Sequence, residues 1–394
     1  MTTTVEDARA AAKDAYNHGR YPIARQLYLP LAEDGDADAQ YHLGEICLLT
    51  TYDHEGALHW WRLAAAQSHA GAQNNLGYMH VSGVGVAADP AEAYRLFQAA
   101  AAQGHAGAQY NLGALYDLGF GVRQDRTEAA RLFRRAADGG SAEALAILAY
   151  MHAHGEGVPR DAEEALRLYN EAAEQGDAVA QLNLGIIYET GDGAPQNLAE
   201  AAFWYQQAAE QGHPDAQLSI AAMYEAGVGV ERDVVEAARF YGMAFRQDNV
   251  AAQIALGRLY MQGAGVEQDY EQAARMLRPA AAAGDAQARN NLGLLHVLGL
   301  ESAQSDAAAA GLFGQAAQQG NAAAQYNLAL LHWRGLGVEE DPIEAYAWAT
   351  LAADGGSRAG AALRGILTDE VTMEQATAGR RRAKDIRATL RETA

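Results

Sequence analysis

The chain has 394 residues, of which 49% are apolar and 20% are charged, a balance that supports packed cores and excludes collagen-like and wholly disordered chains. Acidic residues outnumber basic ones by 50 to 29, and the formal net charge of −21 argues against general nucleic-acid binding, because most of the surface would repel a phosphate backbone. The single cysteine, Cys47, cannot form an internal disulfide, which excludes a bridged extracellular scaffold.

The beginning of the chain, MTTTVEDARAAAKD, has neither the basic region nor the apolar stretch of a secretory signal peptide. No run of about 18 uncharged apolar residues follows it. We therefore expect no integral membrane segment and a cytoplasmic location, or a periplasmic one if a leader has been removed. Residues 1–35 are predicted to form a separate N-terminal helix pair.

From residue 36 onwards the sequence repeats itself. Eight aligned segments of the type AQYNLGALY begin at alanines spaced 36 residues apart. These anchor alanines are Ala72, Ala108, Ala144, Ala180, Ala216, Ala252, Ala288 and Ala324. An earlier copy begins at Ala39, 33 residues before the next, so three residues are predicted to be missing from its internal turn. A fixed period of this length is typical of a linear array in which each copy packs on its neighbours.

Each copy is predicted to hold two helices, because apolar and small residues recur at helical spacing, as at Ala108, Leu112 and Leu115. The first helix ends near a GxGV turn, such as residues 119–122. Glycine in this turn permits the positive φ that stops a helix and reverses the chain.

The second helix of a copy begins with a capping signature. An Asp accepts a hydrogen bond from a backbone N–H, and a Glu three residues later is expected to reach back, as in Asp125 and Glu128. Pro90 and Pro342 occupy the first helical position, where a missing N–H costs nothing. A closing glycine ends the second helix of most copies, with Asp248 as the exception.

Residues 357–394 leave the period and are predicted to form C-terminal capping helices, because an array needs an atypical end to cover its last apolar face. Residues 358–394 carry eight basic and five acidic side chains, a charge of about +3 against about −24 for the remainder. The alternative interpretation of this basic segment is a docking site for an acidic partner or a membrane surface.

These motifs, AxxxLGxxY followed by GxGVxxD and AxxxYxxAAxxG, resemble the Sel1-like repeats, relatives of the tetratricopeptide repeat. The resemblance covers residues 36–356. It implies an all-α fold: a right-handed superhelical solenoid of α/α hairpins, with about ten helix-turn-helix repeats and a C-terminal helical cap. It also implies a protein that displays partner-binding surfaces.

Two copies depart from the pattern. Residues 299–306, GLESAQSD, have lost the second glycine and the valine, so this turn is predicted to differ in shape. In residues 191–197, GDGAPQN, Asn197 replaces the capping Asp. The cysteine pairs of secreted bacterial members are absent, as are glycosylation sequons.

We find no catalytic set, metal site or cofactor site in the pattern. The GxGV turns could suggest a phosphate-binding loop, but six copies without a following GK[ST] or a preceding strand indicate hairpin turns. A single slot of the first helix holds Tyr in some copies and His80, His152, His296 and His332 in others. Metal coordination is not expected there, since these histidines are separated by whole hairpins. Cys47 occupies the same slot and is predicted to be an inert buried thiol.

The first helices are expected to line a concave groove that binds a partner. The position three residues after the anchor alanine should point into the groove, and an Asn side chain there offers a donor and an acceptor to an extended ligand. This position holds Asn75, Asn111, Asn183, Asn291 and Asn327. Neighbouring candidates are Tyr78, Tyr110, Tyr150, Ile186, Arg258, Tyr326, an exposed Trp333, and Arg334. The alternative is that the asparagines bond to neighbouring turn carbonyls and that Trp333 is packed.

The predicted function is that of a non-enzymatic scaffold or adaptor that binds a protein or peptide in this groove, with no nucleic acid and no cofactor. An inhibitory or immunity-type binding protein is the alternative of similar chemistry. A cell-envelope hydrolase or β-lactam-binding protein is the third hypothesis, against which the missing nucleophile, leader and cysteines count.

Overall fold

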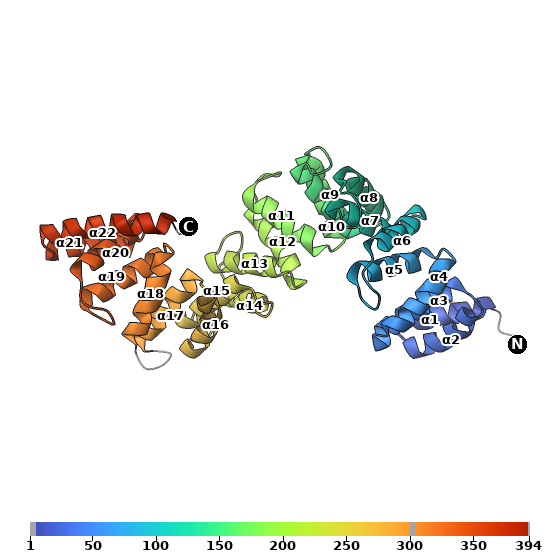
Figure 1. The fold of residues 1–394 in the computed structure, drawn as a ribbon, viewed down its shortest axis with the longest axis horizontal. Coiled ribbons are helices and arrows are strands. Elements are labelled where there is room, and N and C mark those ends of the chain that lie inside the picture. Colours follow the sequence, from blue (N-terminus) through green and yellow to red (C-terminus); the bar gives the residue numbers. More distant parts are fainter. Residues whose placement is uncertain (1–4, 300–304, 393–394) are drawn as a thin grey trace. The chain divides into compact units, whose positions relative to one another are not determined.

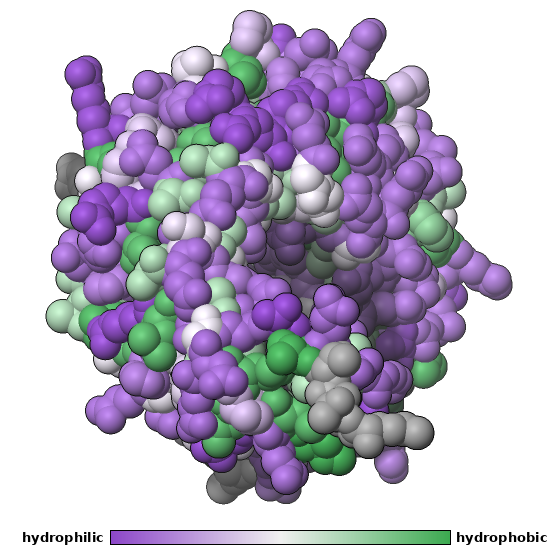
Figure 2. Space-filling model, turned by 90° about the vertical axis from the view of Figure 1, so that its right-hand side faces the viewer, coloured by the Kyte–Doolittle hydropathy of each residue, from purple (hydrophilic) through white to green (hydrophobic). Residues whose placement is uncertain are grey.

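The computed structural model describes residues 5–299 and 305–392, and within these ranges every regular element is an α-helix, 22 in all. The predicted all-α class and the repeated helix pairs are confirmed. The chain divides into two units, residues 1–197 and 198–394, each treated below by itself (Figure 1). The view in Figure 2 shows a largely hydrophilic surface with hydrophobic residues in separate groups.

Unit 1 contains an N-terminal helix pair, followed by the first and second helices of the early repeats in alternation. Its helices are α1 (Val5–Asn17), α2 (Tyr21–Glu33), α3 (Ala37–Thr51), α4 (His54–Ala66), α5 (Ala70–Ser82), α6 (Pro90–Ala102), α7 (Ala106–Leu118), α8 (Arg126–Asp138), α9 (Ala142–His154), α10 (Ala162–Glu174) and α11 (Ala178–Thr190). In the repeats the odd-numbered helices are the first helices.

Unit 2 continues the same alternation and ends in two helices outside the period. Its helices are α12 (Leu198–Glu210), α13 (Pro214–Ala226), α14 (Val234–Phe245), α15 (Val250–Gln262), α16 (Tyr270–Ala282), α17 (Ala286–Leu298), α18 (Asp306–Gln318), α19 (Ala322–Arg334), α20 (Pro342–Asp354), α21 (Arg358–Glu370) and α22 (Met373–Glu392).

The anchor alanines lie at the centre of the packing. All eight that share the 36-residue spacing are fully buried, and Ala39 is 1% exposed. In six of the nine copies the residue five positions after the anchor is a glycine, and in the other three it is Ala149, Ala221 or Ala329. Such a glycine makes room for a large side chain of the second helix. A Cβ at Gly113, for example, would lie 2.9 Å from the ring of Phe133. The AxxxLG motif thus marks the point where a large side chain of the second helix packs against the first helix.

The two glycines of the GxGV turn serve different purposes. The first, such as Gly155 at φ 73°, ends the first helix in the left-handed conformation. The second, Gly157 at φ 70°, also allows close approach, because a Cβ there would overlap the carbonyl oxygen of Arg126 in the preceding copy. In the shortened first copy, α3 runs two residues longer and the left-handed residue is Tyr52, which confirms the predicted shorter turn.

We predict that Gly157→Ala destabilises unit 1 more than Gly176→Ala does. Both glycines have positive φ, so both changes incur about 1–2 kcal/mol of backbone strain. Only Gly157 meets another backbone, whereas nothing lies within 4 Å of a Cβ at Gly176. Chemical denaturation of the two variants measures the difference, and equal losses of stability would contradict the close-approach role.

The predicted Asp caps are present on the second helices, while α18 is capped by Ser305. The Asp125 carboxylate accepts from the backbone N–H groups of Thr127 and Glu128 at 3.1 and 3.0 Å. The predicted return bond from the Glu side chain is wrong for this copy: Glu128 instead binds Arg131, with Nε to Oε2 at 2.8 Å. The charge-assisted pair with an Arg three residues on is the stronger interaction, and Glu164 and Arg167 repeat it.

Most first helices are also capped, by the residue just before the helix, a feature that the sequence did not predict; α13, preceded by His213, has no such side-chain bond. Asp177 and Asn249 accept from the backbone N–H of the anchor alanine. His105 does so through Nδ1, at 3.1 Å from the nitrogen of Ala108. An imidazole nitrogen can accept this bond only when it is unprotonated.

We predict that His105 makes stability depend on pH. Burial, followed by the nearby His69, lowers the pKa of His105. Because the folded-state pKa lies below the ordinary value of about 6.5, the capping contribution is complete above that pH and is lost as pH falls through the lowered pKa. His105→Ser keeps a capping side chain and removes the titration. On acidification from neutral to mildly acidic pH, the unfolding free energy of the wild-type protein should therefore fall relative to that of the variant, and parallel curves would contradict this role.

A buried glutamine after the anchor alanine clamps adjacent copies together. In five copies its Nε2 donates to a second-helix carbonyl eight residues earlier, over 3.0–3.2 Å. These glutamines are Gln40, Gln109, Gln181, Gln217 and Gln325. A second glutamine then completes the clamp, as where Gln247 donates to Gln217 at 2.9 Å.

The closing glycines that the sequence indicated all have positive φ, and Asp248 adopts the same conformation at φ 59°. The predicted change in the turn at 299–306 falls largely outside the described residues, although Gly299 retains the left-handed conformation. Asn197 donates its backbone N–H to the carbonyl of Tyr188 at 2.8 Å.

Helix α22 lies along α20 and covers its side. Ala376, Ala383 and Ile386 are buried there with Tyr346. Arg382 pairs with Glu344, Arg387 with Asp354, and Arg380 donates to the Tyr346 hydroxyl at 3.3 Å. Three arginines of this basic segment therefore bond to side chains of α20.

Candidate functional site

The first helices of the repeats in unit 1 each expose at least one large apolar side chain, and α11 exposes Val179 (50%) at its start in addition to the one considered below. Those considered are Leu49 (54% exposed), Tyr78 (60%), Leu118 (74%), Tyr150 (44%) and Ile186 (42%). They stand six or ten residues after their anchor alanines, and positions four apart share one side of a helix. We call the exposed side of α3, α5, α7, α9 and α11 the first-helix face.

Asparagine side chains connect adjacent helices on this face. Asn111 of α7 donates to Asn74 of α5 at 2.9 Å, and Asn74 donates to Asn75 at 3.3 Å. Asn75 in turn interacts with the Tyr41 hydroxyl of α3. Asn183 of α11 bonds instead to the carbonyl of Val179 within its own helix, at 2.8 Å. Part of the hydrogen-bonding capacity of these asparagines is thus used within the array. The partners are side chains or, for Asn183, a carbonyl of its own helix, and not the turn carbonyls of the alternative prediction.

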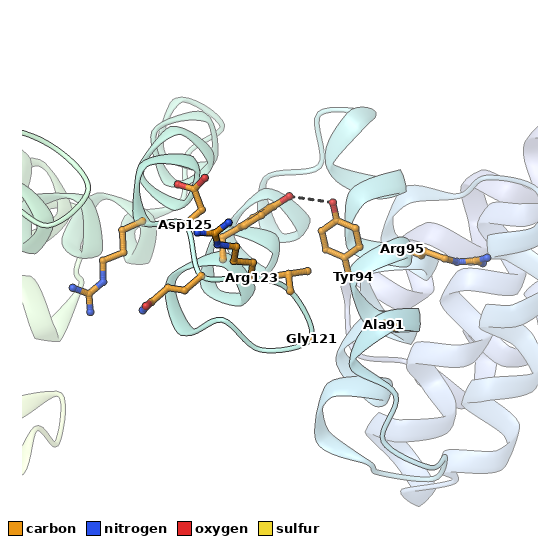
Figure 3. A pocket seen from close by; sticks show the side chains of 10 residues that line it. Ala91, Tyr94, Arg95, Gly121, Arg123 and Asp125 are labelled. Carbon is orange, nitrogen blue, oxygen red and sulfur yellow. Dashed lines mark hydrogen bonds between the residues drawn. The ribbon is translucent and has the colours of Figure 1, made fainter.

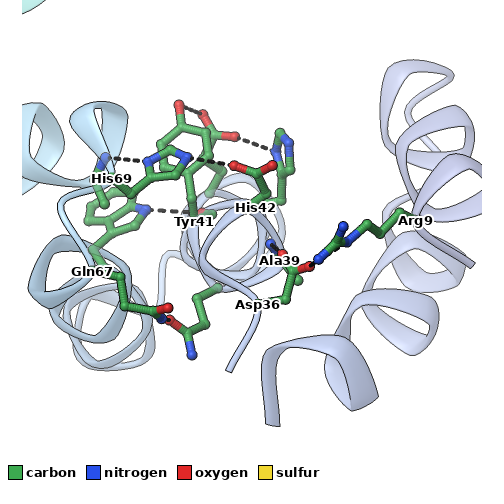
Figure 4. A network of polar contacts seen from close by, with 12 residues as sticks. Arg9, Asp36, Ala39, Tyr41, His42, Gln67 and His69 are labelled. Atoms are coloured by element: carbon green, nitrogen blue, oxygen red, sulfur yellow. Dashed lines mark hydrogen bonds and ion pairs between the residues drawn. The ribbon is translucent and has the colours of Figure 1, made fainter. Parts of the chain in front are cut away.

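Tyr41, labelled with its neighbour His42 in Figure 4, connects this chain of polar contacts to Glu45 of α3. Its carboxylate accepts from the Tyr41 hydroxyl at 2.7 Å and the Tyr16 hydroxyl at 3.0 Å, and lies 3.0 Å from Nδ1 of His42. Burial opposes the charge on Glu45, but these three partners outweigh it and lower the pKa of Glu45. The carboxylate therefore stays ionised at neutral pH, and its side chain is 22% exposed.

Two depressions lie on the first-helix face. One of about 430 Å³ is lined by Leu48, His54, Trp61, Asn74, Asn75, Tyr78, Met79, Val84 and Asn111. The other, of about 620 Å³, lies among α9, α10 and α11, and its lining includes Tyr150, Asn183 and Ile186. Tyr110 is not among the residues that line either depression. Its ring packs on Phe133 at a centroid distance of 5.7 Å, and burial raises its pKa.

The candidate residues of unit 2 have mostly structural roles. Arg258 forms a bidentate pair with Glu225, with Nη2 at 2.5 and 2.7 Å from the two carboxylate oxygens. Asn291 is only 5% exposed and accepts from Gln287 and Asn290. Asn327 donates to Asn290 at 2.8 Å.

The expectation of an exposed Trp333 is wrong. Trp333 and Tyr326 are partly buried and pack against the core formed by α19, α20 and α22. Arg334 is exposed, with its guanidinium carbon 5.9 Å from the Trp333 ring centroid. The slot equivalent to Tyr78 holds partly buried Leu294 and Leu330 in two later copies. Among the first helices of the repeats in unit 2, α17 alone has an exposed large apolar side chain in either slot, Leu298 at 59%, so the continuous row of unit 1 does not recur.

A further depression, of about 1020 Å³, lies between the start of α6 and the turn after α7 (Figure 3). The hydroxyls of Tyr94 and Tyr116 lie 3.0 Å apart at its centre and satisfy each other. Arg126 at its edge is held by Asp117 and Glu156, at 3.4 and 3.2 Å. Sequence reasoning missed this depression, because its wall combines a turn with a helix of the preceding copy.

Groups with reactive chemistry are few. Among the described residues, no three His, Cys, Asp or Glu side chains are placed to hold a metal ion. Cys47 is half-buried, and burial raises the pKa of its thiol, which keeps it protonated. No helix in the described parts of the chain has the length and apolar character needed to cross a membrane.

Comparison with protein-family models matches the Sel1 repeat nine times in succession, over residues 37–69, 70–105, 106–141, 142–177, 178–213, 214–249, 250–285, 286–321 and 322–357. The chain belongs to the Sel1 repeat family. The match confirms the predicted resemblance and its 36-residue period. No enzyme family is detected, and no match was found among curated proteins.

Solved structures with the same repeat resemble this Sel1 repeat protein. The protective antigen c5321 of uropathogenic Escherichia coli, which displays an SLR fold, is 28% identical with a TM-score of 0.60, over 96% of this chain and 91% of that one. A Sel1 repeat protein from Oxalobacter formigenes is 34% identical with a TM-score of 0.51, over 78% and 90% of the two chains. Neither is named for a catalytic activity.

Proposed function

We propose that this Sel1 repeat protein is a non-enzymatic scaffold or adaptor, and that it binds a protein or peptide partner on the first-helix face of unit 1. The observation that carries the proposal is the row of exposed apolar side chains, one on each first helix from α3 to α11. A helix in a repeat array can place polar residues at such positions without loss of packing. Five successive large apolar side chains form the kind of exposed patch that marks an interaction site.

The polar groups beside this row support the same function. Asn111 and Asn183 each use the amide nitrogen for a recorded bond, while no partner is recorded for their carbonyl oxygens among the described residues. Each therefore retains an acceptor for a backbone N–H of a bound chain. The row of exposed apolar side chains, with these carbonyl oxygens beside it, suits an extended ligand whose side chains contact the row and whose backbone N–H groups donate to the oxygens.

We expect the double variant Tyr78→Ala, Leu118→Ala to stay folded and to lose at least about tenfold in partner affinity, or 1.4 kcal/mol. Neither side chain has a recorded hydrogen bond, so their removal should leave the helices intact. The matched control is Ile23→Ala, Leu63→Ala, which removes two exposed apolar side chains from α2 and α4. Partners recovered by affinity purification from producing cells and identified by mass spectrometry provide the ligand for this measurement. Equal losses in the two double variants would contradict a binding role for the first-helix face.

A further inference from the structure

The first-helix face of unit 1 has a one-sided distribution of charge. Helices α3, α5, α7, α9 and α11 contain no Lys or Arg. They carry five acidic residues: Asp38, Glu45, Asp117, Glu143 and Glu189. The basic residues of unit 1 all lie on the second helices, on the connecting turns, or in the N-terminal helix pair. On the first helices themselves the exposed apolar row is therefore accompanied by carboxylates and by no Lys or Arg. Arg160, on a connecting turn, lines the second depression and lies 3.7 Å from Asp192.

Glu45 is the most enclosed of these carboxylates that has no Lys or Arg partner among the described residues. Its three hydrogen-bond partners are aromatic side chains, two tyrosine hydroxyls and an imidazole. The ring of His42 packs against those of Tyr16, Tyr28 and Tyr41, at centroid distances of 4.7, 5.1 and 5.2 Å. An ionised carboxylate among aromatic rings attracts a cation by charge and through the ring faces.

We propose that the partner segment bound on this face is a basic amphipathic chain, with apolar side chains on the Leu49–Ile186 row and a Lys or Arg side chain against Glu45. This inference rests on the proposed function and specifies its partner class. It follows from complementarity of charge and of apolar surface, both of which come from unit 1 alone.

The test uses three fluorescent peptides of equal length, one of Leu and Lys, one of Leu and Glu, and one of Ser and Lys. Their binding to the full chain is measured by anisotropy. We expect the Leu–Lys peptide to bind, the Leu–Glu peptide not to bind, and the Ser–Lys peptide to bind at least about tenfold more weakly than Leu–Lys, because it lacks the apolar contacts.

The protein's overall negative charge could attract any basic peptide, and a pair of isoelectric variants separates that effect. Glu45→Gln should weaken Leu–Lys binding at least about fivefold, whereas Glu174→Gln, an exposed site at the end of α10, should not. Circular dichroism checks that both variants are folded. Equal affinities of the two variants, or no binding of the Leu–Lys peptide, would overturn the inference.

Failure of this inference is distinguishable from failure of the proposed function. If recovery of a cellular partner depends on Tyr78 and Leu118 while peptide binding ignores Glu45, the face binds a partner of another chemistry. If recovery does not depend on Tyr78 and Leu118, the proposed function itself is wrong.

Discussion

Phe133→Ala should lower the stability of unit 1 by about 3–5 kcal/mol, the largest loss that we expect from a single change. Phe133 is 1% exposed, and its ring fills the space left open by Gly113 on the facing helix. Removing the ring leaves a cavity that Gly113 cannot fill, because it has no side chain. Because each copy contacts only its neighbours, hydrogen exchange should rise mainly in α7 and the helices next to it.

The control for this variant is Phe120→Ala in the same copy. Phe120 lies in the turn after α7 and is 40% exposed, so its removal should change stability by no more than about 0.5 kcal/mol. Denaturant unfolding followed by hydrogen exchange measures both variants. Similar losses from the two changes would show that Phe133 is not the packing centre of its repeat.

Leu184→Ala should cost about 2–5 kcal/mol, as truncation of a buried leucine does. Leu184 is fully buried on α11, one residue after Asn183. Leu118→Ala provides the matched control, since Leu118 is 74% exposed at the end of α7. If Leu184→Ala proved as mild as Leu118→Ala, the assignment of buried and exposed sides of the first helices would be out of register.

The sequence predicts much of this fold because the rules that build it are local. A turn glycine, a capping Asp and an anchor alanine each act within a few residues of their own position, and the 36-residue period then places them in every copy. Contacts between copies are harder to predict. Arg258 pairs with Glu225, 33 residues away, and no local pattern separates that pairing from an exposed arginine. Trp333 likewise belongs to a core that includes the C-terminal helix α22.

The glutamine clamp could have been predicted from the sequence. A Gln beside the anchor alanine resembles any polar surface residue when one copy is read alone. Its recurrence as Gln40, Gln73, Gln109 and Gln181 is what indicates a shared structural role. For the first-helix face, the predicted Asn75, Tyr78, Asn111 and Asn183 all line its two depressions. The surroundings of Glu45 could not be predicted from the sequence, because Tyr16, which donates a hydrogen bond to it, belongs to the N-terminal helix pair.

Partner binding on the first-helix face of unit 1 is tested most directly by site-specific photo-cross-linking in cells that produce the protein. The photo-reactive amino acid p-benzoylphenylalanine replaces Tyr78 on α5 in one protein and Leu63 on α4 in the other, two exposed apolar positions of the same unit. We predict a discrete cross-linked partner from position 78 and none from position 63. A partner captured from position 63 alone, or no adduct at position 78, would contradict the account.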